Sequence, residues 1–200
     1  MKLLNVLVLM GLLFTQLTIC RSQDSDQSPF IFTSYGGLFF PSNVEFEKIY
    51  QSHSDLIWGV GVALPTEALT FVTADVAFFR SEGYYDRLND SAATLEQRFI
   101  HVGVLHKETI GRRFFIRLSG GFNHVNVKQK TSGPRSAEQT IEPDKKIGYF
   151  GGIGVERLLE EGRVSFFGDV VYDYCRLHAK ELSGDFGGIR LVVGVHFFLF

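Results

Sequence analysis

Seven ionisable side chains lie within segments that are otherwise apolar and strand-like: Asp75, His101, Arg117, Glu156, Asp169, Asp173 and Arg190. A buried charge without a partner is too costly to keep, so these groups are expected to pair with one another. The carboxylates can balance Arg117 and Arg190 in an internal network of ion pairs, which is the main prediction. A narrow conduction path, a ligand site or a catalytic role remain as alternatives for the same residues.

One serine and one histidine raise the separate possibility of hydrolase chemistry. Ser119 and His124 occur in one extended segment, and a serine nucleophile needs a histidine base within hydrogen-bond reach. Their spacing of five residues places the two side chains on opposite faces of a regular strand. The sequence therefore predicts no catalytic residue.

The remaining polar motifs predict neither a metal site nor a cofactor site. The six histidines are scattered, and His101 and His106 fall on opposite faces of one predicted strand. Glycine pairs such as Gly120-Gly121 resemble phosphate-binding loops, but no predicted helix follows them. In curved strands such glycines permit bending or close packing.

The segments that position these residues alternate between apolar and mixed faces, as half-buried strands do. In the last segment, one face carries the apolar row from Ile189 to Leu199, and the other carries Arg190 and His196. Similar patterns predict eight strands and no helix after the N-terminal region: 29–40, 56–64, 69–80, 95–106, a strand from 113, 147–158, 164–177 and 187–200.

The strand that begins at 113 changes phase near His124, because Val125 and Val127 fall on the face opposite to the earlier apolar row. Either a β-bulge or the departure of the strand from an apolar layer would explain this change.

The connections between the predicted strands alternate in length. Long polar segments at 41–54, 81–93 and 130–144, and a moderate one at 180–185, alternate with tight turns near 65–67, 109–111 and 160–162. An even number of antiparallel strands brings both termini to the side of the short turns. This arrangement is typical of transmembrane barrels, which have short periplasmic turns and longer outer loops.

The composition fits one sheet domain with an apolar outer face. Aromatic residues make up 14% of the chain, with 20 Phe, yet mean hydropathy is only +0.08. No stretch beyond the N-terminus approaches the length of a membrane-spanning helix. The formal net charge of −2 argues against nucleic acid as a partner.

The N-terminus is predicted to be a signal peptide. Lys2 precedes an apolar run at 3–17, and cleavage after Ser22 would leave a short periplasmic lead at 23–28 and a barrel domain at 29–200. Cleavage after Cys20, or lipidation of Cys20, remains an alternative. Loss of residues 1–22 changes the net charge to −4 and leaves Cys175 without a disulfide partner within the chain.

Together these features resemble the small eight-stranded outer-membrane β-barrel family of the OmpA/OmpX type, within the porin-like superfamily. The resemblance covers nearly all of 29–200 and rests on strand pattern rather than on a sequence motif. It implies an all-β, eight-stranded antiparallel up-and-down transmembrane β-barrel in the outer membrane of a Gram-negative bacterium. Phe198 and Phe200 match the family's C-terminal assembly signal, although Arg190, Gly194 and His196 depart from its alternation.

The resemblance also implies partners and a role. Outer-membrane lipid and lipopolysaccharide would surround the barrel, the barrel-assembly machinery would insert it, and the long loops would meet an extracellular ligand. The expected role is structural or surface-interacting, with a lumen filled by side chains. An interfacial aromatic girdle could include Tyr35, Trp58, Tyr84, Tyr149, Tyr172 and Tyr174.

Two other functions remain open. The first is a secreted, soluble, lipocalin-like barrel that binds a small apolar ligand. Trp58 in the second strand and a chain that ends on a strand fit this function poorly, and exposed apolar rows would be unfavourable in water. The second is a barrel enzyme that modifies lipid A, for which Asn126 stands where such deacylases carry serine.

Overall fold

The computed structural model describes residues 30–43, 46, 49–50, 52–67, 69–85, 91–133, 136–141, 146–159, 162–178 and 183–199. The predicted signal peptide, the periplasmic lead, Cys20 and Phe200 lie outside these residues. No helix within them has both the length and the apolar character needed to cross a membrane.

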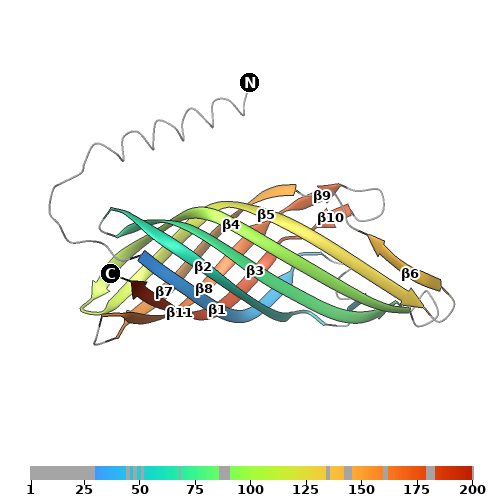
Figure 1. Cartoon of the computed structure of the whole chain (residues 1–200), viewed down its shortest axis with the longest axis horizontal. Helices are drawn as coiled ribbons and strands as arrows, with labels where there is room; N and C mark the ends of the chain where they lie inside the picture. The colour runs from blue at the N-terminus through green and yellow to red at the C-terminus, as the bar shows by residue number, and fades with distance from the viewer. Residues whose placement is uncertain are drawn as a thin grey trace, which may run out of the picture.

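Eight antiparallel strands form a closed barrel, which confirms the predicted fold class (Figure 1). They are β1 (Phe30–Pro41), β2 (Asp55–Glu67), β3 (Thr70–Tyr85), β4 (Ser91–Gly111), β5 (Phe114–Gly133), β7 (Lys146–Leu158), β8 (Val164–Tyr174) and β11 (Gly188–Leu199). Each pairs with its neighbours along this order, and β11 pairs with β1 from Phe30↔Leu199 to Pro41↔Gly188. Three short strands lie in the connections: β6 (Ser136–Ile141), β9 (Arg176–His178) and β10 (Ser183–Asp185).

The two ends of the barrel differ. The start of β1 and the end of β11 meet at one end, here called the proximal end, together with the short turns β2–β3, β4–β5 and β7–β8. Gly162 in the last of these turns has a φ of 69°, a conformation that glycine adopts without steric cost. The other connections lie at the opposite, distal end.

Three strands extend further toward the distal end than the sequence pattern predicted. β3, β4 and β5 contain 16, 21 and 20 residues, whereas β8 contains 11. At about 3.3 Å per residue, β4 is roughly 70 Å long. The predicted long connections at 81–93 and 130–144 were therefore wrong in extent, because β3 continues to Tyr85, β4 begins at Ser91, and β5 continues to Gly133 and pairs with β6.

The polarity of the barrel wall reverses along its length. In the proximal and middle parts, large apolar side chains point outward and form an exposed belt, which includes Val60, Val62, Val104, Ile153 and Val193. In the distal part, apolar side chains point inward instead. This distal core consists of Phe39, Phe46, Tyr50, Ile57, Ala77, Phe79, Ala93, Leu95, Phe99, Val125, Val127, Cys175 and Phe186. Phe167 and Val192 belong to the same buried cluster but lie nearer the middle of the lumen.

This reversal explains the phase change in β5. Val125 and Val127 are each 1% exposed and pair in unbroken register with Phe99 and Gln97 of β4. No bulge interrupts the strand there, so β5 keeps its alternation while it leaves the outer apolar belt. Phe46 and Tyr50 were predicted to belong to a polar connection, but they fold into the distal core and stack on each other at 4.7 Å.

Val127→Asp is expected to disrupt the distal part of the barrel, because it buries a charge among apolar side chains. The free energy of unfolding should fall by roughly 3 kcal/mol or more. Limited proteolysis of the membrane-embedded protein measures the effect as faster cleavage in β4 and β5. Asn126→Asp, one residue earlier and outward-facing, is the matched control and should be cleaved like the wild type. Equal sensitivity of the two variants would contradict the reversal of polarity.

Candidate functional site

The middle of the lumen contains all seven of the ionisable residues singled out in the sequence. They lie between the distal core and a proximal apolar cluster formed by Ile31, Ala63, Phe71 and Leu105, against which Phe198 packs. Their contacts divide them into two groups, one nearer each end.

The distal group is centred on His101, which is 1% exposed. Its Nδ1 lies 3.0 Å from Oδ1 of Asp75, and its Nε2 lies 2.8 Å from Oδ1 of Asp173. Arg190 completes the group through Nε, 2.6 Å from Oδ2 of Asp173. The Tyr35 hydroxyl donates to Asp75 at 2.5 Å, and Asn123 Nδ2 donates to Asp173 at 3.0 Å. The group therefore joins six different strands.

The proximal group is centred on the Glu156 carboxylate. Lys107 Nζ and Arg117 Nη1 approach it at 2.8 and 3.1 Å, and the Ser165 hydroxyl donates to it at 2.6 Å. His196 Nδ1 lies 3.4 Å away. Arg117 also pairs with Asp169, with Nη2 3.1 Å from Oδ2. One carboxylate thus holds side chains from β4, β5, β8 and β11 to β7.

Aromatic rings support the cations of the proximal group. Lys107 Nζ lies 5.1 Å from the ring centroids of both Phe71 and Phe198, and the Arg117 guanidinium lies 4.1 Å above Phe167. Such contacts favour a cation when it is shielded from water. Phe198 therefore points into the lumen, whereas Phe197 and Leu199 are the outward residues at the end of β11.

The space left between the two groups is small. A cavity of about 80 Å³ is bounded by Tyr35, Asp75 and Arg190 on one side and by Arg117, Asp169 and His196 on the other, with Thr73 and Ser119 also in its wall. Small-molecule sites typically occupy about 300–1,000 Å³. This cavity has room for a few water molecules at most, so a lipocalin-like ligand would not fit within it.

Three ionisable members of these groups were missed or misplaced from the sequence. Tyr35 was a candidate for an outer aromatic girdle, but its hydroxyl contacts Asp75 inside the barrel. Lys107 lies one residue beyond the predicted end of its strand, and continuing the alternation of His101, Gly103 and Leu105 would have placed it inside. His196 shares the inward face of β11 with Arg190, and this signal was present in the pattern.

The serine–histidine pair considered from the sequence is not brought together. β5 pairs with β7 in unbroken register from Phe114 to Val125, so Ser119 faces the lumen while His124 faces outward. The wall of the barrel separates the two side chains, and they cannot act as nucleophile and base. Across the described ranges, no group of three or more His, Cys, Asp or Glu side chains is arranged to hold a metal ion.

Glu156→Gln is expected to destabilise the barrel, because it removes the charge that Lys107 and Arg117 share. Breaking a buried ion pair typically costs about 3–5 kcal/mol. Urea unfolding from lipid vesicles measures the change. Glu82→Gln is the control, because its pair with Arg80 is exposed and should contribute less than about 1 kcal/mol. Similar losses in both variants would contradict a dominant role of the buried group.

No known protein-family model matches the chain, and no curated protein matches it significantly in sequence. Solved structures do match its fold. A major outer membrane protein from Thermus thermophilus has a TM-score of 0.58 at 13% identity, covering 86% of this chain and 99% of that one. The outer membrane protein OprG from Pseudomonas aeruginosa has a TM-score of 0.56 at 13% identity, covering 86% and 94%. Neisserial surface protein A has a TM-score of 0.52 at 10% identity, covering 84% and 95%. The fold is therefore that of the small eight-stranded outer-membrane β-barrels, as the strand pattern predicted.

Proposed function

We propose that this protein is an integral outer-membrane β-barrel of a Gram-negative bacterium and that its signal peptide directs its export. Side chains close its lumen. The distal parts of β3, β4 and β5 together with β6, here called the distal sheet, contact extracellular partners. The observation that carries the proposal is the exposed apolar belt. Ile153, Val155 and Val193 are 57%, 57% and 68% exposed, so nothing in the described chain covers them. Lipid would cover such a belt, whereas water would not favour it.

Aromatic residues at both borders of the belt support this location. Toward the distal end, Trp58 stacks on Phe78 at 4.6 Å and Tyr149 stacks on Tyr174 at 4.8 Å. Toward the proximal end, Phe32 and Phe197 lie 6.4 Å apart. Aromatic girdles at the two membrane–water boundaries are typical of barrels that cross a bilayer.

The lumen groups favour a structural role for the interior. Each of the eight barrel strands except β2 contributes a side chain to one of the two ion-paired groups, and apolar clusters close the lumen on both sides. Eight strands enclose only enough space for side chains. Both the cavity size and this closure favour the membrane barrel over a soluble ligand carrier.

The distal sheet is the part of the molecule best suited to meet a partner. β3, β4 and β5 extend beyond the apolar belt, and β6 adds a further strand to β5 (Figure 1). β6 ends the sheet order and pairs, within the described residues, only with β5. An edge strand of this kind can accept an extended segment of another protein as an additional strand.

Replacing 134–145 with a short Gly-Ser connection removes β6 and should reduce attachment of expressing cells to host cells or lower their survival in serum. The expected loss is about tenfold or more if edge pairing supplies most of the contact. Replacing 179–182, in the connection between β9 and β10, is the control and should leave both properties unchanged. Wild-type behaviour of the first variant in both assays would contradict the surface-interaction role.

A further inference from the structure

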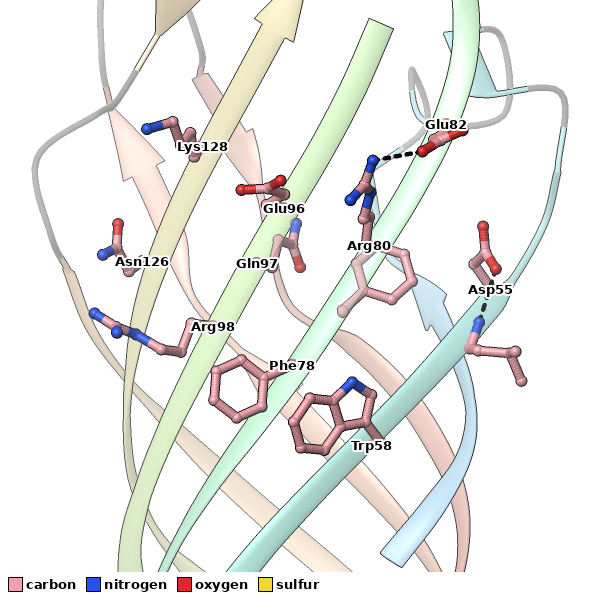
Figure 2. A pocket seen from close by; sticks show the side chains of 12 residues that line it. Asp55, Trp58, Phe78, Arg80, Glu82, Glu96, Gln97, Arg98, Asn126 and Lys128 are labelled. Carbon is pink, nitrogen blue, oxygen red and sulfur yellow. Dashed lines mark hydrogen bonds and ion pairs between the residues drawn. The ribbon is translucent and has the colours of Figure 1, made fainter.

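A groove of about 810 Å³ lies on the outer wall where β2, β3, β4 and β5 run side by side (Figure 2). One cross-strand row at its base consists of Trp58, Phe78, Arg98 and Asn126, which pair in register. In the adjacent proximal row, Val60, Val76 and Ile100 are apolar and the row ends at His124 on β5. The adjacent distal row, Arg80, Glu96 and Lys128, is charged. The groove therefore spans the border at which the outer wall changes from apolar to charged.

The aromatic pair presents a flat, exposed surface at this border. The rings of Trp58 and Phe78 are stacked at 25° with their centroids 4.6 Å apart, and Trp58 is 56% exposed. Figure 2 shows both rings at the proximal side of the groove, with the charged side chains beyond them. Tryptophan is favoured at the headgroup level of membranes because one part of its ring system is apolar and its N–H is polar.

The guanidinium of Arg98 is the cation in the groove that forms no ion pair with a carboxylate of the groove. Asp55 accepts a hydrogen bond from the backbone N–H of Leu56 at 2.8 Å, and Glu82 pairs with Arg80 at 2.7 Å. Glu96 lies in register between Arg80 and Lys128. No hydrogen bond or ion pair joins the side chain of Arg98 to another residue in the described part of the chain. The Arg98 side chain is exposed, and Arg98 pairs in register with Asn126 of β5.

We propose that this groove binds the phosphate-bearing headgroup of the glycolipid in the outer leaflet, an inference that rests on the proposed membrane location. Arg98 would bind a phosphate through paired N–H donors. Asn126 and the outer carboxylates would contact sugar hydroxyls, and acyl chains would lie along the apolar row of Val60, Val76 and Ile100. In the proposed orientation, the position of the groove at the distal border of the belt places it at the outer leaflet.

Trp58 provides a direct test, because it is the only tryptophan in the chain. The full-length barrel in uncharged detergent micelles is titrated with bisphosphorylated lipid A while the emission of Trp58 is recorded. The expected result is a saturable change in the wild type and an apparent affinity about tenfold weaker in Arg98→Gln. Arg157→Gln is the matched control, since Arg157 is an outward arginine near the proximal border, 5.5 Å from the ring of Phe114. Its affinity should stay within about twofold of the wild type.

Titrations with three other ligands identify the source of the phosphate. Lipid A without phosphates, phosphatidylglycerol and inorganic phosphate should each bind markedly more weakly than bisphosphorylated lipid A. Equal binding by any of them, wild-type affinity in Arg98→Gln, or an equal loss in Arg157→Gln would overturn the proposal. Gel mobility of the same samples with and without boiling separates the two proposals. A heat-shifted barrel whose Trp58 does not respond to lipid A refutes only the lipid site.

Discussion

Pairing of every backbone N–H and C=O group around a closed sheet is the constraint on which the rest of this structure depends. A spanning sheet surrounded by lipid has no water to satisfy an open edge. The seam between β1 and β11, continuous from Phe30↔Leu199 to Pro41↔Gly188, removes that edge. Closure also determines which side of each strand is enclosed, because successive side chains point to opposite faces. The outer belt and the lumen are two consequences of the same pairing.

Closure with eight strands leaves a narrow interior, and the lumen residues are adapted to it. Glu156 and Asp173 each contact side chains from several strands, so each acts as a common partner across the barrel. Space for these groups depends on glycine residues in the wall of the barrel. A Cβ at Gly154 would overlap the carboxylate of Asp169, which shows how closely the wall approaches the network. A filled interior of this kind leaves little room for another molecule in the middle of the lumen.

Much of the fold could be predicted because the outer belt imposes a two-residue period on each strand. The eight barrel strands, their order and the inward face of Asp75 or Arg190 follow from that period. The extent of β3, β4 and β5 does not follow from that period, because beyond residues such as Phe78 the apolar side chains move to the inner face. A prediction that requires apolar side chains on the outer face therefore ends each strand at the border of the belt. The same effect made Phe46 and Tyr50 look like parts of a polar connection.

Contacts within the lumen could not be predicted from alternation. Whether Glu156 meets Lys107 or Arg190 depends on the stagger between strands around the whole barrel, which no single strand encodes. Lys107 was missed because its strand was expected to end at His106. Tyr35 was assigned to the outer wall because tyrosine is common at membrane borders. Its contact with Asp75 of β3 depends on the register that β1 shares with β2 and on the register that β2 shares with β3.

The most direct test of a closed barrel embedded in the outer membrane is gel mobility of the protein extracted from that fraction, with and without boiling. A closed, hydrogen-bonded barrel resists detergent until it is heated. The account predicts that the unboiled band in the outer-membrane fraction migrates differently from the boiled band. A protein found in the soluble periplasmic or secreted fraction, with one mobility before and after boiling, would contradict the assignment of the apolar belt to lipid.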